Sequence, residues 1–168
     1  VKARAESMRD FGPCLSPVNA FLIIQGIETL SLRVQRICDN ALQLAEFLQS
    51  LPQVVAVQYP GLKNHPYHQR AIRYLINGFG GVLTFELNAG LEMTEKFVDS
   101  LELIHHLANV GDTRTLIIQP AATTHNQLTA DQQKSAGIRP SLLRLSLGIE
   151  HVEDIKKDIV QALKKAAI

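Results

Sequence analysis

One arginine lies among side chains that cannot neutralise its charge. Arg144 stands in the apolar stretch 142–147, which alternates like a strand and places Leu142 and Ser146 on the arginine's side. A charge buried without a partner is unfavourable, whereas a planar guanidinium binds a carboxylate through two parallel hydrogen bonds. Arg144 is therefore either an anchor for a substrate carboxylate, or a structural residue in an internal salt bridge or on a solvated edge strand.

A second set of polar side chains lies on either side of a short apolar strand, within residues 109–125. Asn109 and Gly111 come before this strand, and Thr123 and Thr124 follow it. Small polar groups at strand ends are suited to binding a ligand. The structural alternative is that Asn109 and Gly111 end one helix and the two threonines begin the next.

Other chemistries find little support in the sequence. His65 and His68 would need a third ligand to hold zinc, and adjacent His105 and His106 point apart on a helix, so we expect no metal site. Cys14 and Cys38 have no metal or redox spacing, which favours free thiols in a reducing cytoplasm. We also find no phosphate loop and no nucleophile motif.

Length and charge limit the class of protein. The 168 residues suffice for one domain, and 17 basic against 16 acidic residues favour neither nucleic acid nor an anionic membrane as a partner. No stretch approaches the length of an apolar membrane span. The chain begins at Val1, not Met, and we expect it to be a fragment of a longer protein.

The periodicity predicts an α/β domain, an α+β sandwich of about four strands covered by helices. The predicted helices are residues 2–10, 17–51 with a bend near Gly26, 66–76, 92–106, 129–136 and 152–166. The predicted strands are residues 54–57, 82–87, 115–118 and 142–147.

Five stretches in order resemble one known family, the PLP-dependent enzymes of Cys/Met metabolism, which have the aspartate-aminotransferase-like fold. They are residues 15–22 (LSPVNAFL) with 25–33 (QGIETLSLR), 59–62 (YPGL) with His65-Pro66, 80–85 (GGVLTF), 109–112 (NVGD) with 123–125 (TTH), and 143–150 (LRLSLGIE). The resemblance covers the whole chain. It implies an interdomain helical segment at 1–51 and the C-terminal small domain, with a mainly antiparallel sheet, at 52–168.

Within the family, the stretches around residues 112–116 and 123–125 look most like the O-acetylhomoserine sulfhydrylase branch, which replaces acetate by sulfide to give homocysteine. Ala108 and Asn109 depart from the acidic residue and Ser typical of cystathionine lyases. A cystathionine synthase or methionine γ-lyase activity, and a stand-alone carboxylate-binding domain without catalysis, remain the alternatives.

The resemblance implies that Arg144 binds the α-carboxylate of an amino-acid substrate, with Asn109 and Thr124 in support. Pyridoxal phosphate would be the cofactor of the longer protein, held by an N-terminal domain that the chain lacks. No lysine here has the family's Ser-x-Thr context, so we expect no catalytic residue, no cofactor-binding residue and no activity in the fragment alone. The longer protein would be a cytoplasmic homotetramer.

Overall fold

The structure is a computed structural model that describes residues 1–168, apart from the side chain of Ala130. It divides into two compact units, Val1–Leu32 and Arg33–Ile168. This division falls inside a helix, whereas the boundary predicted after residue 51 concerns the domains of a longer protein and stays a prediction.

The first unit is helical. It contains η1 (Arg4–Met8), α1 (Arg9–Phe11) and α2 (Pro17–Glu28). Ser16 Oγ accepts a hydrogen bond from the Asn19 N–H at 3.1 Å, which confirms Ser16 as the predicted N-cap. The predicted long helix is interrupted at Thr29, between α2 and α3 (Leu30–Ser50), three residues after the position of the bend predicted near Gly26.

A five-stranded sheet organises the second unit, in the order β1-β2-β5-β4-β3. The strands are β1 (Val54–Gln58), β2 (Val82–Leu87), β3 (His105–His106), β4 (Leu116–Ile118) and β5 (Leu142–Ser146). All neighbours pair antiparallel except β3 and β4, which are parallel. The predicted fold class is confirmed, with β3 as a strand that the sequence did not indicate.

The helix predicted over residues 92–106 is wrong in its second half. Helix α5 (Leu91–Asp99) ends seven residues earlier than predicted, and His105–His106 form β3. The physical reason is Asp158, whose carboxylate accepts the backbone N–H groups of Glu102, Leu103 and Ile104, each at 2.9 Å. A helix would need these N–H groups for its own carbonyls.

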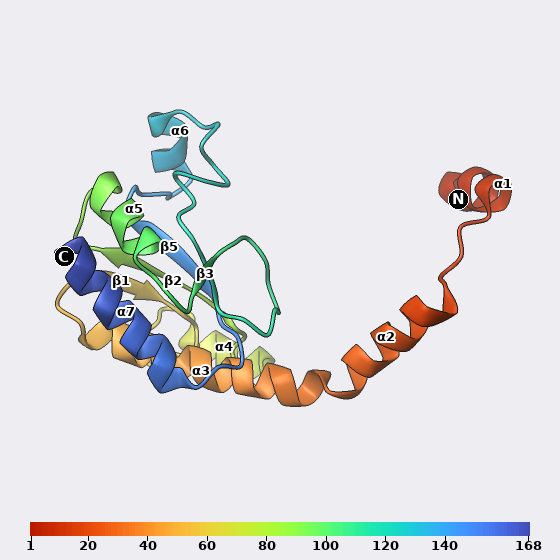
Figure 1. Cartoon of the computed structure of the whole chain (residues 1–168), viewed down its shortest axis with the longest axis horizontal. Coiled ribbons are helices and arrows are strands. Elements are labelled where there is room, and N and C mark those ends of the chain that lie inside the picture. The colour runs from red at the N-terminus through yellow and green to blue at the C-terminus, as the bar shows by residue number, and fades with distance from the viewer. The chain divides into compact units, whose positions relative to one another are not determined.

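The main core lies between one face of the sheet and three helices, α3, α5 and α7 (Val152–Ala166). Figure 1 shows α3 and α7 on the near side of the sheet. Fully buried members of this core include Leu44, Leu48, Phe85, Phe97, Leu143, Ile155 and Ile159.

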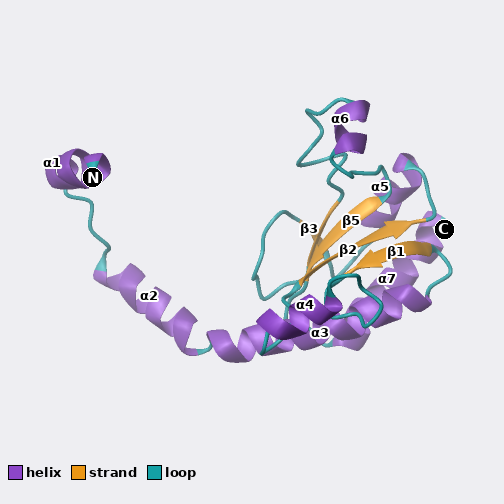
Figure 2. Ribbon diagram, turned by 180° about the vertical axis from the view of Figure 1, so that it is seen from behind, coloured by secondary structure: helices purple, strands orange, loops and turns teal.

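The two remaining helices, α4 (His68–Tyr74) and α6 (Ala130–Ser135), are short. Figure 2 shows the opposite face of the sheet from α3 and α7, with α4 near one end of it. No helix among the described residues is both long and apolar enough to cross a membrane.

Candidate substrate site

Arg144 occupies the middle of the sheet. It lies on β5, which is the third of five strands, and pairs with Thr84 of β2 on one side and Ile118 of β4 on the other. Its strand neighbours Leu143 and Leu145 point into the main core, so Arg144 projects from the other face. The interpretation of Arg144 as an edge-strand residue is therefore wrong.

The Arg144 guanidinium has no protein partner in the described part of the chain. Its Nε atom is buried and makes no hydrogen bond there. The carboxylate nearest to it by strand register is Glu86, which pairs opposite Leu142. Glu86 instead accepts a hydrogen bond from Arg139 Nη1 at 2.8 Å. An internal salt bridge therefore does not explain Arg144, and a buried donor without an acceptor is the arrangement that an anionic ligand would satisfy.

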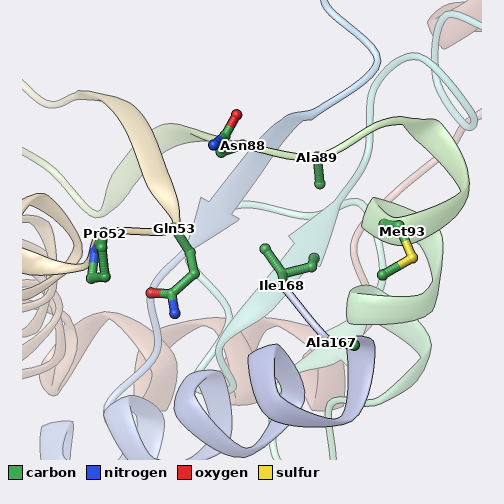
Figure 3. A pocket seen from close by; sticks show the side chains of 7 residues that line it. All are labelled: Pro52, Gln53, Asn88, Ala89, Met93, Ala167 and Ile168. Atoms are coloured by element: carbon green, nitrogen blue, oxygen red, sulfur yellow. The ribbon is translucent and has the colours of Figure 1, made fainter.

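A hollow of about 590 Å³ lies beside this face of the sheet. Glu86 and Arg139 belong to its wall, together with residues of the α6 end and the following turn. A different hollow, of about 340 Å³, lies near the C-terminal end of α7 and is shown in Figure 3. Its wall contains no ionisable side chain; the residues are Pro52, Gln53, Asn88, Ala89, Met93, Ala167 and Ile168.

Asn109 lies in the loop of residues 107–115, which connects β3 to β4. Its side chain is exposed, and its Oδ1 accepts the Val110 N–H at 2.8 Å. Asp112 stabilises the same loop by accepting the Arg114 N–H at 3.0 Å. That hydrogen bond is the largest of the effects that lower the pKa of Asp112, so the carboxylate is ionised at neutral pH. The loop ends no helix, and the capping interpretation of Asn109 is wrong.

Thr124 lies in the turns that follow β4. It is exposed, and its hydroxyl is 2.8 Å from His125 Nδ1. Neither it nor Thr123 caps α6, contrary to the structural alternative. The cap is Thr129, which forms a capping box with Gln132.

The parallel pairing of β3 and β4 brings the loop with Asn109 and the turns with Thr124 out at the same end of the sheet. β3 and β4 are parallel neighbours, so the loop with Asn109 and the turns with Thr124 both leave the sheet from their carboxyl ends. The last residue of β4, Ile118, lies directly beside Arg144. That Asn109, Thr124 and Arg144 share one substrate remains a prediction.

Sequence reasoning missed two residues that fix the end of the Asn109 loop, Thr115 and Glu150. The Glu150 carboxylate accepts both the Thr115 N–H (2.6 Å) and the Thr115 hydroxyl (2.8 Å). The one available signal was an acidic residue two positions after the Gly that follows a strand, and that pattern is also typical of a helix start.

Among the described residues, no group of three or more His, Cys, Asp and Glu side chains is arranged to hold a metal ion. Both cysteines are free thiols, Cys14 exposed and Cys38 buried.

Comparison with known proteins connects these features to a family. The family model described as Cys/Met metabolism PLP-dependent enzyme matches residues 1–164. The chain is 52% identical to O-acetyl-L-homoserine sulfhydrylase 1 of Thermus thermophilus, over 97% of the chain and 39% of that protein. It is 48% identical to the homocysteine synthase of Schizosaccharomyces pombe, over 97% of the chain and 38% of that protein.

A solved structure has a similar fold. The putative O-acetylhomoserine (thiol)-lyase of Campylobacter jejuni, which contains N'-pyridoxyl-lysine-5'-monophosphate, superposes with a TM-score of 0.86 at 38% identity. The match covers 97% of this chain and 39% of the other. The chain thus spans about two fifths of the length of the relatives it matches.

Proposed function

Because the chain belongs to the Cys/Met metabolism family of PLP-dependent enzymes, we propose that it is the substrate-carboxylate-binding domain of a sulfhydrylase. In the longer protein, sulfide would replace the acetate of O-acetylhomoserine and give homocysteine. The observation that carries this proposal is the Arg144 Nε atom, buried on the central strand without an acceptor in the described chain.

Arg144 would bind the α-carboxylate of the amino-acid substrate. A guanidinium donates two parallel hydrogen bonds to a carboxylate, which fixes the rotation of the substrate as well as its position. That orientation determines where the Cα–H bond points, and correct positioning of a reacting bond contributes directly to the rate. Asn109 and Thr124, in the segments that follow β3 and β4, would support the same carboxylate.

The cofactor chemistry belongs to another part of the proposed enzyme. Pyridoxal phosphate, when bound, would supply an electron sink for negative charge that develops at the substrate α-carbon. A lysine that forms a Schiff base is activated when burial or a neighbouring cation lowers the pKa of its amine. Four of the eight lysines here form ion pairs with acidic side chains and the other four are exposed, and we propose that the lysine that holds the cofactor lies in a preceding domain. The paired ones are Lys2, Lys156, Lys157 and Lys165; the exposed ones are Lys63, Lys96, Lys134 and Lys164.

A preceding cofactor-binding domain would also cover the apolar surface of α2. All of its large apolar side chains are exposed, with Phe21 at 60% and Ile27 at 62%. Exposed apolar surface of this extent marks an interaction site. The preceding domain and the other subunits of a homotetramer are the partners we propose for it, and the cytoplasm is the compartment.

The test is a substitution of Arg144 in the complete protein that contains this chain. Arg144→Met removes the charge and the paired donors, and we expect KM for the amino-acid substrate to rise about 100-fold. Arg139→Met is the matched control, because it removes an arginine near the same face that already has a carboxylate partner. KM should change less than about threefold there.

The decisive comparison uses the substrate in which a carboxamide replaces the α-carboxylate. The unmodified protein should strongly prefer the carboxylate, and Arg144→Met should abolish that preference. If the variant still discriminates between the two compounds as the unmodified protein does, Arg144 is not the carboxylate anchor. A complete protein that binds the amino acid through Arg144 without converting it would instead indicate a non-catalytic binding domain.

A further inference from the structure

The loop that carries Asn109 is attached to the turn after β5 by several hydrogen bonds at its far end. Ile149 N–H donates to Thr113 O at 2.9 Å. The Glu150 carboxylate accepts both the N–H and the hydroxyl of Thr115. The hydroxyl oxygen of Thr115, Oγ1, in turn accepts the Gly148 N–H at 3.0 Å. Thr115 is fully buried, so these bonds are shielded from water.

The same turn is packed too closely for any side chain at Gly148. A Cβ atom there would lie 2.3 Å from Thr113 O and 2.4 Å from Glu150 Oε2. Helix α3 holds the turn from the other side, where the buried Asn40 amide donates to Gly148 O at 3.0 Å and to Glu150 O at 2.9 Å. The turn is therefore a fixed support and not a flexible connection.

We propose that Glu150 is a positioning residue for the substrate site, an inference that rests on the proposed function. At its near end, the loop is held by the bond from Leu107 N–H to Ile117 O. At its far end, Glu150 holds Thr115. Between these two points, the side-chain hydrogen bonds of the loop join only residues of the loop itself. Together with the backbone bonds from Ile149 N–H to Thr113 O and from His105 N–H to Thr115 O, the Glu150 carboxylate therefore fixes where the loop ends relative to Arg144, and with it the place of Asn109.

Replacing the carboxylate by an amide tests this role with little change of shape. Glu150 accepts two hydrogen bonds from one residue. In Glu150→Gln the amide oxygen can accept only one of them, and the NH₂ group faces the other donor. If the Thr115 hydroxyl turns to accept from the NH₂ group, its own proton is left without an acceptor in a buried place. The end of the loop should consequently shift or loosen.

The experiment measures KM and kcat in the complete protein for Glu150→Gln, with Leu48→Ala as the control. Leu48 is fully buried in the main core and lies on α3, so its truncation lowers stability without touching the loop. Glu150→Gln should raise KM for the amino-acid substrate about 10-fold to 100-fold, with a smaller change in kcat. Leu48→Ala should lower the thermal midpoint and leave KM within about twofold.

A double variant separates positioning from stability. If Glu150 acts through the loop, adding Glu150→Gln to Asn109→Ala should raise KM by less than about threefold more, because the positioned side chain is already gone. Full additivity of the two effects would overturn the proposal, as would a Glu150→Gln protein with a lowered thermal midpoint and unchanged KM. In either case the carboxylate preference lost in Arg144→Met would still stand, so the proposed function and this inference fail separately.

If Glu150→Gln fails to fold, two variants of Thr115 test the same link. Thr115→Ser keeps the hydroxyl between Glu150 and Gly148, and Thr115→Val removes it while keeping the backbone bond to Glu150. We expect Thr115→Ser to keep the KM of the unmodified protein and Thr115→Val to have a raised KM. Equal KM values for the two variants would refute the role of this link.

Discussion

The carboxylate of Asp158 accepts four hydrogen bonds, and its replacement by an amide should lower the stability of the fold by a measurable amount. The side chain is 5% exposed on α7 and accepts the N–H groups of Glu102, Leu103 and Ile104 together with Gln161 Nε2, all at 2.9 Å. In Asp158→Asn one oxygen can still serve Leu103 and Ile104. The new NH₂ group then faces the Glu102 N–H and Gln161 Nε2, which are also donors. Both of their hydrogen bonds are lost, and the donor hydrogens repel one another.

Hydrogen bonds to a charged group contribute about 1.5–3 kcal/mol each, and solvent near the exposed Glu102 reduces the loss there. We therefore expect Asp158→Asn to lower the free energy of unfolding by about 2–4 kcal/mol. The assay is urea denaturation of the 168-residue chain, followed by far-ultraviolet circular dichroism. Asp154→Asn is the matched control on the same helix, because its side chain is 58% exposed and has one ion pair, worth less than about 1 kcal/mol. A stability of Asp158→Asn within about 0.5 kcal/mol of the unmodified chain would refute the reasoning.

Two further predictions concern stability. Burial, and then electrostatic repulsion from Cys38 and Asp39, raise the pKa of Tyr59 well above its usual 10.0. The contribution of the neutral Tyr59 phenol to the free energy of unfolding is therefore fully present below pH 10 and is lost as pH rises above that value. Urea midpoints should fall between pH 8 and 11, and they should fall less in Tyr59→Phe. Gly148→Ala should lower stability by about 1–3 kcal/mol because its Cβ meets backbone, whereas Gly90→Ala, with open space around it, should change stability by less than about 1 kcal/mol in the same urea assay.

Much of the fold follows from local sequence. β2 matches the predicted strand to the residue, and α7 matches the predicted terminal helix, because strict alternation and an apolar stripe each have one structural solution. The helix error at residues 100–106 has the opposite origin. The N–H groups that end the helix are bonded to Asp158, more than 50 residues later in the chain, and no local pattern contains that information.

In the candidate site, too, some features could be predicted from local sequence and others depend on contacts between distant residues. The sequence indicated that Arg144 needs a partner, since one charge within an apolar strand is visible without any structure. Whether a protein carboxylate supplies that partner depends on strand order and on Glu86 being bonded to Arg139. Thr115 and Glu150 are 35 residues apart and could not be connected from spacing alone.

The contacts of the C-terminal part of the chain explain how a segment with little regular structure is held. Between Glu102 and Thr115 the only strand has two residues, both exposed, and it lies at the edge of the sheet. Such a strand is too short to fix a loop by its ladder alone. Two carboxylates hold the segment at its ends, Asp158 at the N–H groups of residues 102–104 and Glu150 at Thr115. Both belong to residues 150–158, the turn before α7 and its first half, so the placement of Asn109 relative to Arg144 depends on the docking of that helix.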